Sequence, residues 1–205
     1  MQTRRWHRLI WAGGLVLAFL LTDTSAHAAD SPEPQHSGWS LYLDNDTLVP
    51  SPRDQDYTGG FSLTQAGRAA ASGVSLDPVL GHINDALGIE GESAEAGRLQ
   101  LHARQLGVAI FTPGDMEVDD ITRGDRPYSG LVYMASTRLL LDLHQPDTVH
   151  QSTLTVGLLG LEVVGELQQE LHQSIGAARP VGWERQISNG GEPTFRYSHA
   201  VQHLL

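Results

Sequence analysis

The chain has 205 residues, of which 13 are basic and 24 acidic, so its net charge is −11 with histidine neutral. It has no cysteine, which excludes a disulfide scaffold, a catalytic thiol and a thiolate metal site. Every basic residue is arginine, which excludes a Schiff-base or P-loop lysine. The acidic balance argues against nucleic acid as a partner, because phosphates require a basic surface. The composition fits a soluble domain or a membrane β-barrel.

The first 28 residues have the three parts of a secretory signal. Arginines precede an apolar run over 9–21, and the small-x-small triplet Ala26-His27-Ala28 follows. The run is too short to cross a bilayer as a helix, so a cleaved signal peptide over 1–28 is predicted rather than an uncleaved anchor. Residues 29–37 are polar and contain proline, which predicts a short flexible segment before the folded domain.

From residue 38 onward, apolar and polar residues alternate, the pattern of strands with unlike faces. The pattern predicts six strands of about ten residues, near the length of a tilted transmembrane strand. They cover 38–44, 57–67, 99–111, 131–141, 152–159 and 194–204. Residues 73–98, with several glycines and a cluster of glutamates, are expected to be a long exposed loop.

One helix is predicted, over residues 162–175. Its apolar stripe at helical spacing consists of Val164, Leu167, Leu171 and Ile175. Gly176 stands where a helix commonly ends, and Pro180 prevents continuation.

Six strands are too few for a membrane barrel, because a closed barrel leaves no strand edge facing lipid and has eight strands or more. Either the chain is a truncated piece of a longer barrel, or another chain supplies the missing strands. We expect residues 38–205 to be an outer-membrane β-barrel domain that is truncated at its C-terminal end.

Three short motifs could carry chemistry, and each also has an ordinary structural interpretation. Asn45-Asp46 could hold a cation or an oxyanion, but it could equally be a turn. Residues 54–60 combine two aspartates, a threonine hydroxyl and two glycines, although a loop entering a strand would look the same. Residues 125–130 hold an Asp-Arg pair and Tyr128, which could be a surface ion pair and an interfacial aromatic.

His172 on the predicted helix is the candidate general base, because imidazole titrates near neutral pH. It lies four residues after Gln168, so both share a face that flanks the apolar stripe. The alternative is a histidine on the helix surface. The chain has no GxSxG, HExxH or glycine-rich phosphate loop, which disfavours the enzymes that carry those motifs.

Taken in order, these motifs resemble the outer-membrane lipid A 3′-O-deacylase family. The resemblance runs from about residue 39 to the end of the chain, through short pieces whose number, order and spacing are together fairly specific. The matching pieces are Asn45-Asp46, Asp56-Tyr57-Thr58-x-Gly60, Ile110-Phe111-Thr112-Pro113, Gly124-Asp125-Arg126-Pro127-Tyr128-Ser129-Gly130, Gly157-Leu158-Leu159-Gly160, Gln168-x-x-x-His172, Gly182-Trp183-x-x-Gln186-Ile187-x-Asn189 and Glu192-Pro193.

The resemblance implies a twelve-stranded outer-membrane barrel, of which this chain covers about half, that removes the 3′-acyloxyacyl chain of lipid A by calcium-dependent ester hydrolysis. On this interpretation His172 activates a water, while Ca²⁺ near Asp46 and Thr58 polarises the ester carbonyl with help from Asn45. The helix would lie outside the barrel wall and present His172 to lipid. The implied partners are lipid A or lipopolysaccharide, outer-membrane lipids and the barrel-assembly machinery.

Two positions depart from the family pattern. The family has a glutamate soon after the helix histidine, but residues 176–179 are Gly-Ala-Ala-Arg. The residues that could replace this acid as a calcium ligand are Glu117, Asp119 and Asp120. The family also has a lysine in the loop after the Thr-Pro motif, where Arg123 or Arg126 would have to serve here.

Two further functions remain open from the sequence. The chain could be an inactive structural or lipid-binding barrel that has lost its acid. It could also be a barrel phospholipase with a serine nucleophile, for which Ser40, Ser62 and Ser129 are available outside any recognisable nucleophile motif.

Overall fold

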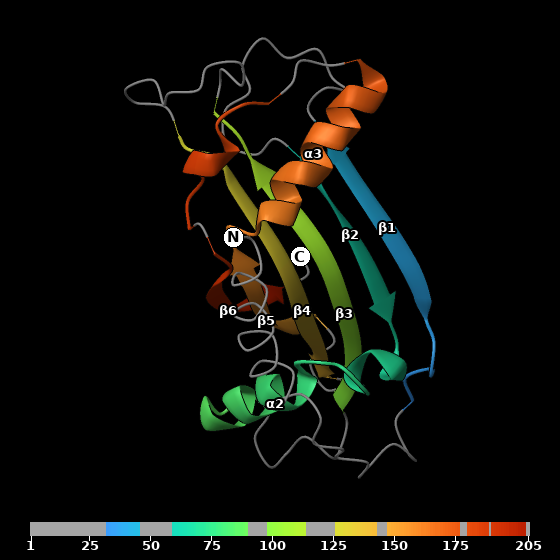
Figure 1. Cartoon of the computed structure of the whole chain (residues 1–205). Helices are drawn as coiled ribbons and strands as arrows, with labels where there is room; N and C mark the ends of the chain where they lie inside the picture. The colour runs from blue at the N-terminus through green and yellow to red at the C-terminus, as the bar shows by residue number, and fades with distance from the viewer. Residues whose placement is uncertain are drawn as a thin grey trace.

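The computed structural model describes residues 32–45, 59–89, 98–113, 126–142, 147–176, 180–188 and 190–203. Six strands form one antiparallel sheet in which every strand pairs with its neighbours along the chain (Figure 1). They are β1 (Gly38–Asn45), β2 (Gly59–Ala66), β3 (Arg98–Phe111), β4 (Ser129–Asp142), β5 (Thr148–Leu159) and β6 (Glu192–His203). The six strands predicted from the alternation are therefore confirmed, and within the described ranges they form an open sheet.

The two faces of the sheet differ sharply in polarity, because side chains alternate along each strand. One face, called here the apolar face, carries two adjacent rows of apolar side chains that cross all six strands. The rows are Leu43, Phe61, Val108, Val132, Leu158 and Pro193, and Leu41, Leu63, Leu106, Met134, Val156 and Phe195. On the opposite face, the amide of Gln105 donates to the hydroxyls of Ser62 and Thr64 at 3.0 and 3.2 Å.

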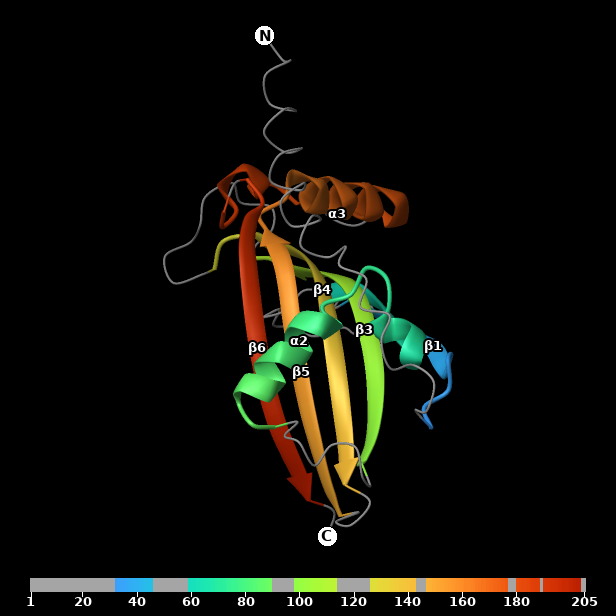
Figure 2. The same cartoon turned by 90° about the horizontal axis from the view of Figure 1, so that it is seen from below.

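Residues 73–98 contain a helix, so the prediction of one long loop there and of a single helix in the fold is wrong. α2 (Asp77–Ala86) follows a short 3₁₀ helix, η2 (Arg68–Ala71), and lies on the apolar face across β4 and β5 (Figure 2). Pro78 stands in its first turn, a position that favours a helix start. Leu76, Leu80 and Leu154 are buried together beneath it. The helix was missed because it is short and because it is stabilised by packing on the sheet.

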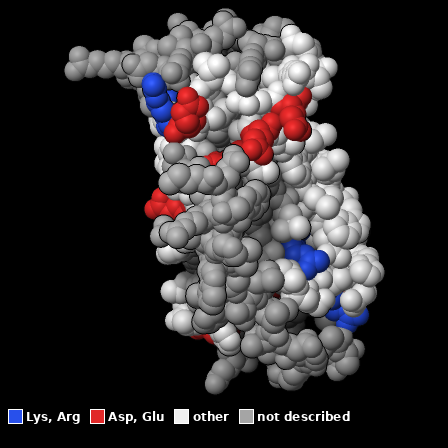
Figure 3. All heavy atoms as spheres, viewed as in Figure 1, with Lys and Arg blue, Asp and Glu red and all other residues white. Residues whose placement is uncertain are grey.

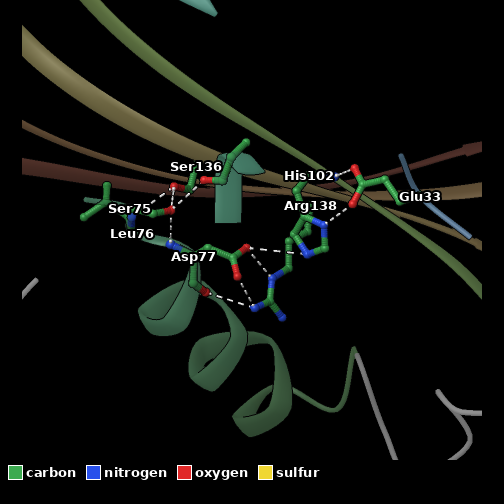
Figure 4. Close-up of polar contacts among 8 residues, drawn as sticks. Glu33, Ser75, Leu76, Asp77, His102, Ser136 and Arg138 are labelled. Carbon is green, nitrogen blue, oxygen red and sulfur yellow. Dashed lines mark hydrogen bonds and ion pairs between the residues drawn. The ribbon is translucent and has the colours of Figure 1, made fainter. Parts of the chain in front are cut away.

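A buried polar network joins α2 to the sheet at this end (Figure 4). The guanidinium of Arg138 in β4 donates to both carboxylate oxygens of Asp77 at 2.7 Å. The carboxylate of Glu33, which is 2 % exposed, accepts from the backbone N–H of His102 and contacts its ring Nδ1, both at 2.7 Å. Residues 32–37, the described part of the segment expected to be flexible, therefore include a side chain held against β3.

α3 (Glu162–Ile175) lies at the other end of the sheet and coincides with the predicted helix. Gly176 ends it in the left-handed conformation, with φ 71° and ψ 22°, as the sequence predicts. Its cluster includes Val108 and Val132, so it packs on the same apolar face as α2 (Figure 1). Within the described ranges, none of the helices has the length and apolar character needed to cross a lipid bilayer.

Candidate active site

α3 buries a different stripe from the one its sequence predicts. Val164, Gln168 and His172, spaced four residues apart, face the sheet, and His172 is only 4 % exposed. Leu167 and Leu171 are each 47 % exposed, so their predicted burial is wrong. The description of His172 as a surface histidine is excluded by the same measurement.

The outward side of α3 therefore combines apolar and acidic side chains. Val163 is exposed next to Leu167 and Leu171, and beside this row run three exposed glutamates, Glu162, Glu166 and Glu170. Figure 3 shows acidic side chains gathered at the α3 end of this face, with mainly neutral side chains along the edge where β1 lies.

Trp183 holds the buried side of α3 in place. Its indole N–H donates to Oε1 of Gln168 at 2.9 Å, and both side chains are buried. Its ring lies 4.9 Å from that of Tyr128, centroid to centroid, at an interplanar angle of 41°. Tyr128 is 3 % exposed, so it is a core residue and not an interfacial aromatic. Gln168 precedes His172 by one helical turn, so this cluster fixes the turn from which the imidazole projects.

Two glycines allow α3 to approach its neighbours closely. A Cβ on Gly130 of β4 would lie 2.6 Å from Cγ1 of Val164. A Cβ on Gly165 would lie 2.7 Å from Cδ2 of Trp183. Any larger residue at either position would force the helix away from the sheet, because packed interiors do not absorb such overlaps.

The segment after α3 is fixed to the start of β4. It contains the 3₁₀ helix η4 (Trp183–Arg185), and the N–H of Ile187 donates to the carbonyl of Tyr128 at 2.8 Å. Gly160 has φ +76°, and a Cβ there would lie 1.1 Å from the carbonyl oxygen of Ser188. Only glycine fits at this crossing, so the loop and the sheet keep one arrangement.

The remaining predicted site residues converge on the same end of the sheet in part. Asn45 is the last residue of β1 and pairs with Gly59, the first of β2, at the end where β5 leads into α3. Asp46 and Thr58, the predicted calcium ligands, lie outside the described residues, as do Asp54, Asp56, Glu117, Asp119, Asp120, Arg123 and Asp125. Topology thus brings the strand ends that flank Asp46 and Thr58 to the end of the sheet that carries α3.

The serine nucleophile hypothesis loses support from the register of the sheet. Ser40, Ser62 and Ser129 all belong to the face opposite the one on which α3 packs. A histidine on α3 is therefore separated from these hydroxyls by the sheet itself. Within the described part of the chain, no group of three or more His, Cys, Asp or Glu side chains is arranged to hold a metal ion.

Trp183 and Tyr128 are the functional neighbours that sequence reasoning missed, since each appears there only within a longer motif. A tryptophan directly after Gly182 and two positions before an arginine looks like any exposed loop aromatic. The signal that could have identified it is the pair of small residues, Gly130 and Gly165, which indicates a large partner side chain.

The family model described as Outer membrane protein LpxR matches residues 15–205, nearly the whole chain. Neither the curated proteins nor the solved structures compared with the chain matched it.

Proposed function

The chain belongs to the outer membrane protein LpxR family, the lipid A 3′-O-deacylases, and from this membership we propose that it hydrolyses the ester that links the 3′-acyloxyacyl chain to lipid A. Membership supports an outer-membrane protein that acts on lipid A. The ester bond, the chemistry and the residue roles are our proposal.

The observation that carries the proposal is the position of His172. It is buried on the side of α3 that packs on the apolar face of the sheet. In an outer-membrane barrel the apolar face is the one in contact with lipid. A base held there meets a lipid ester from the membrane side, where acyl chains lie, and it would take a proton from the attacking water.

A buried and anchored base suits this reaction, because general base catalysis requires a fixed distance to the water that is deprotonated. Gln168 and Trp183 supply the anchor through their 2.9 Å hydrogen bond. Val164, packed against Gly130, sets the depth at which the helix lies. The side chains next to the imidazole therefore orient it without taking part in the chemistry.

We propose calcium as the cofactor, held by Asp46 and Thr58 with Asn45 nearby. Their donor atoms are carboxylate, hydroxyl and amide oxygens, which are the ligands that Ca²⁺ prefers. When bound, the ion would act as a Lewis acid on the ester carbonyl. Arg126, which lies in the described loop before β4, is the candidate for the lipid A phosphate.

The remaining proposals concern the whole protein. We propose that the six strands are part of a closed twelve-stranded barrel, that residues 1–28 are removed on export, and that the barrel-assembly machinery inserts the protein. Apolar rows that cross every described strand support a lipid-facing wall.

The proposal is tested by mass spectrometry of lipid A from a Gram-negative host that expresses the complete reading frame. Wild type should release a mass equal to an acyloxyacyl group, and His172→Ala should release none while still assembling in the outer membrane. His82→Ala is the matched control, because His82 is an exposed histidine on the other helix. Activity that survives in His172→Ala would refute the mechanism. An unchanged spectrum with folded wild type would favour the inactive barrel.

A further inference from the structure

Gln186 has a buried acceptor that the fold leaves without a partner. Its side chain is 7 % exposed, and Oε1 is fully buried and makes no hydrogen bond within the described part of the chain. A buried acceptor that is left unpaired opposes folding, and native proteins seldom retain one. Where one persists, a role in binding is a physical explanation for it.

The position of Gln186 connects it to the candidate active site. Its N–H donates to the carbonyl of Trp183 at 3.2 Å, which places it at the end of η4. Trp183 in turn donates to Gln168, one helical turn from His172. The next residue, Ile187, is tied to Tyr128 at the start of β4. Gln186 is therefore held between two anchored residues of the wall that seats α3.

A carbonyl oxygen in such a wall selects ligands that carry an N–H or O–H donor. Lipid A offers a donor beside the scissile bond, because its sugars carry an amide-linked acyl chain on the carbon next to the 3′ ester. An ester analogue with oxygen in place of the amide nitrogen would leave the Gln186 acceptor unpaired. Sites built to accept a hydrogen bond discriminate strongly against ligands that lack the donor.

We propose that Gln186 is a substrate-binding residue whose side-chain carbonyl accepts the amide N–H of an N-acylated sugar and so selects lipid A over esters without that donor. This inference rests on the proposed deacylase function. The residue touches the sugar amide beside the reacting ester and does not take part in proton transfer.

The test compares two synthetic glucosamine-type lipids, one with an amide-linked and one with an ester-linked acyl chain on carbon 2, both esterified on carbon 3. The purified full-length protein in detergent micelles should cleave the amide substrate with a kcat/KM about tenfold higher or more. Gln186→Met, which keeps the length of the side chain and removes the acceptor, should abolish the preference. It should lower kcat/KM for the amide substrate only. Gln186→Glu keeps an acceptor and should retain the preference, and Gln173→Met, on the exposed side of α3, should behave as wild type.

Each other result counts against the inference. Equal losses on both substrates in Gln186→Met would mean that the residue acts structurally. A wild type that cleaves both substrates equally would overturn the inference even if Gln186→Met fails to fold. A folded wild type that cleaves neither substrate would refute the proposed function, and the inference would fall with it.

Discussion

Gly130→Ala is the sharpest test of how α3 is seated. The new Cβ would lie 2.6 Å from Cγ1 of Val164, whereas non-bonded carbons rest at about 3.5–4.0 Å, so the helix must move by about 1 Å. β4 has little freedom to yield, because the carbonyl of Gly130 accepts from the N–H of Gly160 at 2.8 Å. Overpacking of this kind destabilises by about 1–3 kcal/mol.

The larger effect should be on catalysis. α3 moves as a rigid element, so His172 moves with Val164, and a misplacement of about 1 Å reduces rate by roughly 100-fold. The assay is the initial rate of acyl-chain release from lipid A micelles by purified full-length protein. Gly190→Ala is the control, because no atom lies within 4 Å of the position where its Cβ would stand.

A compensating substitution makes this reasoning refutable. Val164→Ala removes both methyl groups that meet the new Cβ, and by itself it should cost about 2 kcal/mol of stability. In the double variant the two effects should be less than additive, since the residues are in contact. Its rate should return to within about tenfold of wild type. Full activity in Gly130→Ala, or strict additivity in the double variant, would show that α3 is not seated on this contact.

Three further predictions concern other parts of the molecule. Trp183→Phe leaves the buried carbonyl of Gln168 without its indole donor, so it should destabilise by about 1–3 kcal/mol and lower kcat more than it raises KM; an unchanged kcat would contradict the anchoring role. Asp77→Ala takes a carboxylate from the partly buried Arg138 and should lower the temperature at which the folded band is lost on gels, by about 3 kcal/mol of stability, with acyl release per folded molecule unchanged. Chelation of divalent cations should abolish acyl release, and calcium should restore it better than magnesium, which prefers a smaller and more regular site; activity that survives chelation would remove calcium from the proposal.

The sheet could be predicted from the sequence because strand alternation has a period of two and needs no knowledge of neighbours. Ranges such as 99–111 and 131–141 fall within β3 and β4 almost to the residue. The helix over 162–175 was predicted for a similar reason, since Gly176 marks its end. Polarity patterns of this kind are local, so a single chain reveals them.

The side of α3 that is buried was decided only by tertiary structure. Hydrophobicity favours Leu167 and Leu171 as the buried pair, but the helix buries Gln168 and His172. In water, leaving two leucines half-exposed is unfavourable. Next to a lipid-facing surface the preference reverses, because leucine is at home there and a polar group needs a partner, which Trp183 supplies to Gln168.

The same distinction explains α2 and Trp183. α2 is short and weakly apolar, so it becomes a helix only where Leu76 and Leu80 meet the sheet and Asp77 meets Arg138. Trp183 gains its role only when residues far apart in the chain bring Tyr128 beneath it. The sequence by itself determined the strands, the catalytic helix and the family motifs, because those depend on local periodicity and residue type. The burial of His172 and the anchoring of its helix were decided by contacts between distant segments.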